Sequence, residues 1–183
     1  MSDRANRSFE IITADDLKRL GQLALSNFED FFRRNPKHPY VERLRLICLL
    51  QTAAKHYVEP DQGNPASTKG GVNDFDVCGF FEALPNRHLY SQRKCNLDFG
   101  RSKFGRNPDD GERFSGRRLD VMWRDINFGS AESPIHAVQR YLQNAPPHSS
   151  SGKGLEEKTR RGSVADKDVS GPSNGTRFIT AST

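Results

Sequence analysis

The residues best suited to chemistry in this chain are two aspartates that follow a glycine turn. Gly70 and Gly71 lead into Asp74 and Asp76, with Phe75 between the two acids. In an extended strand the side chains of residues i and i+2 leave by the same face, so the two carboxylates are expected to stand side by side. Like charges held this close repel each other unless a cation or a shared proton lies between them. The pattern therefore predicts a Mg²⁺ site, or else a solvated turn that carries two acids.

A third carboxylate lies far along the chain, on a second predicted strand. Residues 117–124 alternate well enough for a strand that places Leu119, Val121 and Trp123 on one face. Asp120 then belongs to the opposite face. If the two strands are neighbours in one sheet, this acid is expected beside Asp74 and Asp76.

Basic residues lie between and next to these acids. The glycine-punctuated loop 98–106 contains Lys103 and Arg106, and Arg118 lies two residues before Asp120. Side chains of this charge attract anions, and an arginine can pair with one through two parallel hydrogen bonds. The other interpretation is a solvated basic loop with salt bridges to the aspartates, and both stay open.

Taken together, these segments resemble the polymerase-beta-like nucleotidyltransferase superfamily. Its pattern is a glycine turn, an Asp-x-Asp pair on one strand and a lone Asp on a later strand, which Asp74, Asp76 and Asp120 match. The chain is more particularly similar to a bacterial group of uncharacterised proteins with Gly-Val-x-Asp-Phe-Asp-Val, a basic glycine loop and Gly-Arg-Arg-x-Asp. Residues 71–77, 98–106 and 116–120 match those segments, so the resemblance covers roughly residues 40–145.

The resemblance implies a metal-dependent transfer of a nucleoside monophosphate from a nucleoside triphosphate to a hydroxyl on a protein, a nucleic acid or a small molecule. Two Mg²⁺ ions are expected, with Asp74 and Asp76 bridging them. Asp120 is expected to bind the metal nearest the attacking hydroxyl and to help remove its proton. The nucleotide-binding residues implied are Gly70, Gly71, Lys103, Arg106 and Arg118.

The chain departs from the superfamily at the upstream glycine turn that grips the nucleotide. Gly63-Asn64 has a suitable spacing but lacks the serine, and the alternative alignment at residues 51–54 has lost the glycine. The small residue and the backbone N–H groups of that turn are what hold the phosphates. This motivates a second hypothesis, a non-catalytic nucleotidyltransferase-like binding or antitoxin-type module. A metal-dependent nuclease is a third, because carboxylates and basic charge suit it as well.

Two helices and a small sheet are expected to position these residues. Thr13 and Asp16 resemble a capping box that starts a helix over 14–34, and Ser133-Pro134 starts a second helix that ends by residue 145. Residues 41–58 suit a helical face, although their second half also suits a buried strand. The fold class predicted is α/β of the α+β type: a small mixed β-sheet with the acids on one face and the helices packed on the other.

Composition indicates one domain with an appendage. Only 34% of the 183 residues are hydrophobic, and the mean hydropathy is −0.78, which is low for a chain that folds throughout. From residue 146 onward the sequence is rich in Ser, Gly, Lys and Thr. We expect a flexible N-terminus over residues 1–12, a nucleotidyltransferase-like domain over 13–145 and a disordered tail over 146–183.

Charge and cysteine usage suggest the surroundings. A net charge of +5 favours polyanionic partners such as nucleotides or nucleic acid, and it also suits an ordinary soluble surface. The chain has no run of 18 apolar residues and no apolar N-terminal stretch, so we expect a cytoplasmic protein without a membrane partner. Cys48, Cys78 and Cys95 form no Cys-x-x-Cys pair and are expected to be reduced. The sequence does not indicate an oligomeric state.

Overall fold

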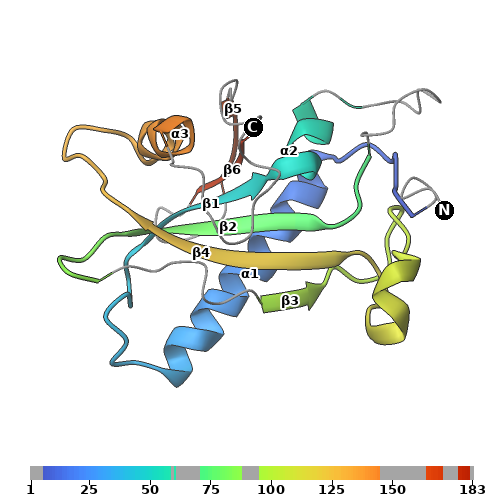
Figure 1. The fold of residues 1–183 in the computed structure, drawn as a ribbon, viewed down its shortest axis with the longest axis horizontal. Helices are drawn as coiled ribbons and strands as arrows, with labels where there is room; N and C mark the ends of the chain where they lie inside the picture. The colour runs from blue at the N-terminus through green and yellow to red at the C-terminus, as the bar shows by residue number, and fades with distance from the viewer. Residues whose placement is uncertain are drawn as a thin grey trace.

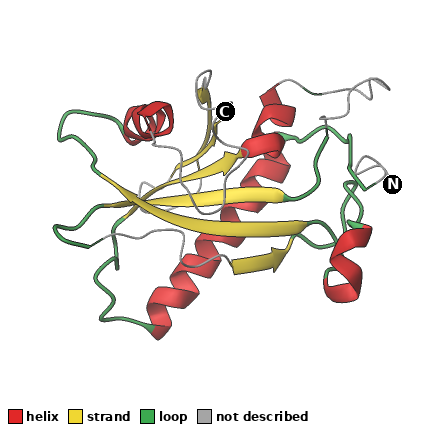
Figure 2. Ribbon diagram, in the orientation of Figure 1, coloured by secondary structure: helices red, strands yellow, loops and turns green. Residues whose placement is uncertain are grey.

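The computed structural model describes residues 6–58, 60, 71–87 and 95–144 and two strands over 164–170 and 177–181. A mixed sheet runs through the molecule in the order β3-β4-β2-β1-β6-β5 (Figure 1), which confirms the predicted α+β class. The elements, coloured by type in Figure 2, are α1 (Ala14–Arg34), β1 (Leu44–Leu50), α2 (Gln51–Val58), β2 (Phe75–Glu82), β3 (Cys95–Asp98), the 3₁₀ helix η1 (Pro108–Arg113), β4 (Arg118–Ile126), α3 (Pro134–Asn144), β5 (Val164–Ser170) and β6 (Arg177–Ala181).

Helix α1 has the start and the length that the sequence predicts. The Asp16 backbone N–H donates to Thr13 Oγ1 and the Thr13 N–H donates to Asp16 Oδ2, so the capping box is complete. The helix lies across one face of the sheet in Figure 1, and its Phe28 meets Phe81 and Trp123 edge to face. This aromatic packing anchors α1 on the sheet, because such pairs add about 0.5–1.5 kcal/mol to the burial of their area.

Helix α3 packs on the opposite face from α1, so the prediction that both helices share one face is wrong. Its Ile135, Ala137 and Val138 join a core cluster with Cys78 and Phe80, which alternate with the residues that face α1. The strands carry apolar side chains on both faces over their second half, and each face therefore needs its own cover. The acids at the start of β2 and β4 lie on the face that α3 covers further along.

The order of strand and helix within residues 41–58 is the reverse of the prediction. Residues 44–50 form the strand and residues 51–58 the helix. Strand β1 pairs with β2 on one side and with β6 on the other, so its continuous apolar run is that of a central strand. Helix α2 buries only Ala53, Ala54 and His56, and this His56 Nε2 lies 3.1 Å from the Glu10 carbonyl oxygen.

The chain ends contribute to the domain where they are described. Two backbone hydrogen bonds join Ser8 to Val72, and Ile12 is buried, so residues 6–12 of the segment expected to be flexible lie against the domain. Within the tail predicted to lack regular structure, β6 pairs in parallel with β1 and β5 pairs with β6. The edge of β1 that faces away from β2 supplies the backbone groups that pair with β6. The other residues of 1–12 and 146–183 lie outside the described residues.

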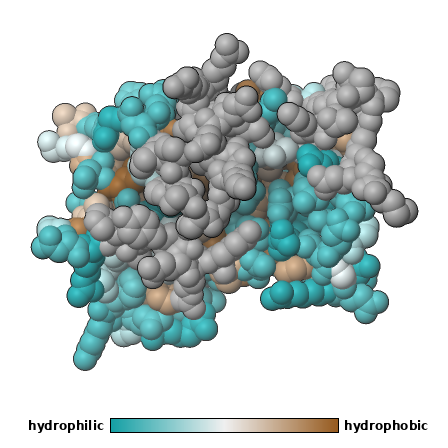
Figure 3. Space-filling model, viewed as in Figure 1, coloured by the Kyte–Doolittle hydropathy of each residue, from teal (hydrophilic) through white to brown (hydrophobic). Residues whose placement is uncertain are grey.

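The surface agrees with the low mean hydropathy. Hydrophilic residues make up most of the described surface in the view of Figure 3, and Ile11 is a large hydrophobic side chain that stays exposed. In the part of the chain that the structure describes, no helix combines the length and the apolar character needed to cross a membrane. Cys48, Cys78 and Cys95 are free thiols, as expected, and burial raises the pKa of Cys78 to about 12.

Candidate functional site

The pairing of β2 with β4 brings the predicted acids together. The two strands are parallel neighbours, and Asp76 lies directly opposite Asp120 in their register. Residues in register on neighbouring strands point to the same face of a sheet, so these two side chains share a face. Asp74 lies immediately before β2, and Arg118 connects it to Asp120 through ion pairs.

The guanidinium of Arg118 lies among three carboxylates. Its Nη2 is 2.6 Å from Asp74 Oδ2, its Nη1 is 2.6 Å from Asp110 Oδ1 and its Nε is 3.0 Å from Asp120 Oδ1. Asp120 is fully buried, whereas the Arg118 side chain is 25% exposed. Burial by itself lowers the pKa of Arg118, but the hydrogen bond to Asp74 and the charges of Asp120 and Asp110 raise it overall. The sequence left open whether Arg118 is a phosphate ligand or forms salt bridges to the aspartates. In this structure Arg118 forms the salt bridges.

Asp110 belongs to this cluster, and the sequence analysis did not find it. It lies on η1, which begins after Asn107, and the buried Asn107 side chain accepts a hydrogen bond from the Asp109 N–H. The same side chain donates to Asn73 Oδ1 at 3.0 Å, which ties η1 to the residue before Asp74. No pattern in the sequence predicts this contact, because it joins segments 34 residues apart.

The donor set suits a hard divalent cation. Asp74, Asp76 and Asp120 supply carboxylate oxygens, the ligands that Mg²⁺ prefers. In the present arrangement the Arg118 guanidinium lies between Asp74 and Asp120, and among the described residues no three His, Cys, Asp or Glu side chains are grouped so as to hold a metal ion. The acids therefore fit a cation by chemistry, and in this arrangement the cation among them is Arg118.

Arg117, the neighbour of Arg118, points to the other face of the sheet and is buried there. Its Nε donates to the Phe104 carbonyl oxygen at 2.9 Å, and its Nη1 donates to the carbonyl oxygens of Asn73, at 3.2 Å, and Asn6. Burial lowers the pKa of Arg117, although the charges of two nearby aspartates oppose the shift. This side chain joins the N-terminal segment, the start of β2 and the basic loop.

Gly71 is required by the backbone at the entry to the site. Its φ is +76°, and a Cβ atom there would lie 2.7 Å from the Ser8 carbonyl oxygen, so a side chain would collide with the N-terminal segment. A positive φ of this kind favours glycine. The structure thus gives Gly71 a conformational role in placing Asp74, while Gly70 lies outside the described residues.

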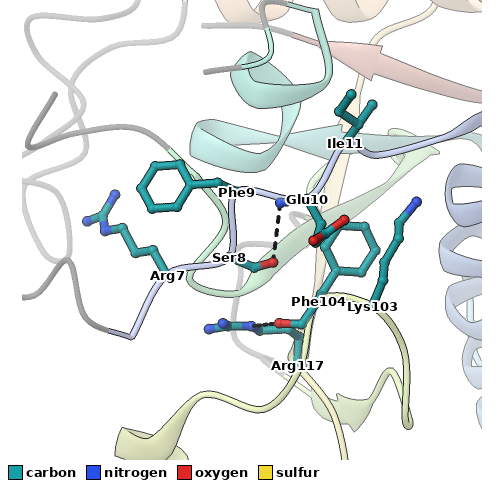
Figure 4. A pocket seen from close by; sticks show the side chains of 8 residues that line it. All are labelled: Arg7, Ser8, Phe9, Glu10, Ile11, Lys103, Phe104 and Arg117. Atoms are coloured by element: carbon teal, nitrogen blue, oxygen red, sulfur yellow. Dashed lines mark hydrogen bonds between the residues drawn. The ribbon is translucent and has the colours of Figure 1, made fainter. Parts of the chain in front are cut away.

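Lys103 lies in a different place from the acids. Its Nζ is 2.7 Å from Asp16 Oδ2 at the start of α1, and it lines an open pocket with Phe104, Arg117 and residues 7–11 (Figure 4). None of the three predicted acids lines this pocket. Arg106 is exposed on the same loop. Of the predicted basic residues, the structure therefore brings only Arg118 to the carboxylates.

The turn between β1 and α2 adjoins the acids. Leu50, the last residue of β1, pairs with Asp76, and Gln51 follows at once with a φ of +58°. Glycine adopts such a conformation at little cost, whereas glutamine is uncommon there. The structure therefore places the 51–54 turn beside Asp76, while Gly63-Asn64 lies outside the described residues.

Comparisons with known proteins do not add to this geometry. No family model, no curated protein and no solved structure matches the chain. The resemblance to nucleotidyltransferases therefore stays a prediction from the motifs. Any functional argument depends on where the structure places the residues of those motifs.

Proposed function

We propose that this chain is a metal-dependent nucleotidyltransferase that moves a nucleoside monophosphate from a nucleoside triphosphate to a hydroxyl of a nucleic acid, a protein or a small molecule. One observation carries the proposal: Asp76 and Asp120 lie opposite each other on the parallel strands β2 and β4, and the β1–α2 turn lies beside Asp76. A pair of acids next to a helix start suits a metal-bound triphosphate, because the acids hold the cation and the helix N-terminus attracts phosphate.

The acids of β2 and β4 and the start of α2 have separate parts in this proposal. Asp74, Asp76 and Asp120 would hold Mg²⁺, which supplies charge neutralisation at the phosphates when bound. The first backbone N–H groups of α2 have no acidic residue in the first turn to occupy them, so they suit phosphate oxygens. Asp120 is fully buried on β4, which lies between β3 and β2, and it is the group proposed to accept the proton of the attacking hydroxyl.

The test is calorimetric titration with each nucleoside triphosphate, in Mg²⁺ and in chelator. We expect the wild type to bind a triphosphate only with Mg²⁺, and Asp76→Asn and Asp120→Asn to weaken that binding about tenfold or more, since each charged ligand contributes more than 1.4 kcal/mol. Glu82→Gln is the matched control, because Glu82 is a carboxylate at the far end of β2 that pairs with Arg45. Failure of the wild type to bind, or binding that survives both substitutions, would contradict the proposal.

A second candidate function is nucleotide binding without transfer. It is favoured by two observations: the Arg118 guanidinium lies among the acids, and Gln51 has a positive φ that glycine adopts at less cost. Labelled triphosphates added to a cell lysate separate the two functions. Transfer of label that needs Asp120 supports the enzyme, whereas Mg²⁺-dependent binding without any transfer supports the binding module.

A further inference from the structure

The proposed cation site already contains a cation that belongs to the chain. Arg118 contacts Asp74 and Asp120, two of the proposed metal ligands, at 2.6 and 3.0 Å. We propose that Arg118 is an internal counter-ion, which neutralises the acids in the metal-free protein and competes with a divalent cation for them. This inference rests on the proposed function, because it takes Asp74 and Asp120 to be cation ligands.

Electrostatics makes the two cations exclusive at this place. A guanidinium in contact with Asp74 and Asp120 repels a divalent cation, and it also uses carboxylate oxygens that the metal needs. Either cation offsets part of the repulsion among the carboxylates of Asp74, Asp76 and the buried Asp120. The measured metal affinity therefore includes the free energy needed to move Arg118.

Arg118 is more accessible to solvent than Asp120, while Asp74, at 20%, is exposed about as much as Arg118. Its side chain is 25% exposed, whereas Asp120 is fully buried in the β2–β4 pair. Arg118 also pairs with Asp110 on η1, and Asp110 is not one of the proposed metal ligands. Asp110 thus holds Arg118 over the acids, and weakening this contact favours the metal.

Mn²⁺ titration by calorimetry, without nucleotide, tests the competition directly. Arg118→Gln removes the positive charge, and Asp110→Asn weakens one of its three contacts while every proposed ligand is kept. We expect Arg118→Gln to bind Mn²⁺ about tenfold more tightly than the wild type, within the usual range of coupling between two ligands, and Asp110→Asn to show a smaller gain. Arg140→Gln is the matched control, because Arg140 pairs with Glu132 at the start of α3 and is 52% exposed. It is expected to bind Mn²⁺ as the wild type does.

The outcomes separate this inference from the proposed function. The counter-ion role of Arg118 is contradicted if Arg118→Gln and Asp110→Asn bind Mn²⁺ with the affinity of the wild type or more weakly. The proposed metal site is kept in that case. Absence of Mn²⁺ binding in all of them overturns both. Circular dichroism establishes that each variant is folded, and Asp110→Asn decides the question if Arg118→Gln does not fold.

Discussion

Two adjacent arginines, Arg117 and Arg118, use the same side chain in opposite ways on the two faces of the sheet. Arg117 is buried and donates to backbone carbonyl oxygens of Asn6, Asn73 and Phe104. Arg118 is partly exposed and pairs with carboxylates. Carbonyl groups are neutral and fixed in the backbone, whereas carboxylates attract any cation. The acceptors therefore decide the role of each arginine. Arg117 stabilises the fold, whereas a cation that binds the carboxylates can displace Arg118.

The largest expected effect comes from removing the structural member of the pair. Arg117→Met removes a donor from carbonyl groups of three segments, one buried at Phe104 and two part-buried at Asn6 and Asn73. A buried carbonyl group left unsatisfied costs about 1–3 kcal/mol. We expect a loss of about 3–5 kcal/mol in the free energy of unfolding. Urea denaturation measures it against Arg140→Met, which removes an exposed arginine and is expected to change the free energy of unfolding far less. A loss in Arg117→Met no larger than in that control would contradict a structural role.

A smaller and reversible effect is expected at Arg118. Arg118→Met leaves the buried Asp120 without its counter-ion, for which we expect a loss of about 1–3 kcal/mol in chelator. Mn²⁺ should restore part of this loss, since a ligand that binds only the folded state stabilises it. Thermal unfolding with and without Mn²⁺ checks both points. If Mn²⁺ restored the stability of Arg117→Met equally well, the proposed difference between the two arginines would be wrong.

The smallest effect concerns the loop that leads into both arginines. The Asp98 carboxylate accepts hydrogen bonds from the backbone N–H groups of Gly100, Ser115 and Gly116 and from the Ser115 hydroxyl. Burial alone raises the pKa of Asp98, but these hydrogen bonds outweigh it, and the folded pKa is lowered below 3.8. Stability from this group is therefore complete above the unfolded pKa and is lost as the pH falls through the folded pKa.

Asp98→Asn is accordingly expected to lower the melting temperature at neutral pH, by less than Arg118→Met does. The gap to the wild type should narrow as the pH falls below about 4, where the wild-type carboxylate takes up its proton. Melting curves at a series of pH values measure this gap. A difference that stayed constant down to acidic pH would show that the charge of Asp98 does not contribute.

The sequence predicted the parts of the fold that depend on local signals. Helix α1 begins at its capping box, and the alternation over 117–124 marks β4. The predicted order of helix and strand within residues 41–58 was wrong. A fully apolar run suits a central strand and a buried helix equally well until its neighbours are known. The sequence prediction also missed that α1 and α3 cover opposite faces of the sheet, because the neighbours of each strand were not known.

The candidate site was predicted in part. Asp74, Asp76 and Asp120 were selected by type and spacing, and the structure brings them together. Arg117 and Arg118 point to opposite faces because side chains alternate along a strand. Their acceptors lie up to 111 residues away, so the sequence did not identify them. Asp110 joins the site through η1, and no periodicity in the sequence marks such a contact.

The pairing of β2 with β4 also has a consequence for the order of folding. Asp74 meets Arg118 across 44 positions of the chain, whereas β1 and β2 are joined by a shorter connection. Closing a long loop costs entropy before any contact rewards it, so the β2–β4 pairing is expected late. Until then the acids of β2 remain hydrated and apart from Arg118. The charged site is thus expected to assemble after the β1–β2 pair.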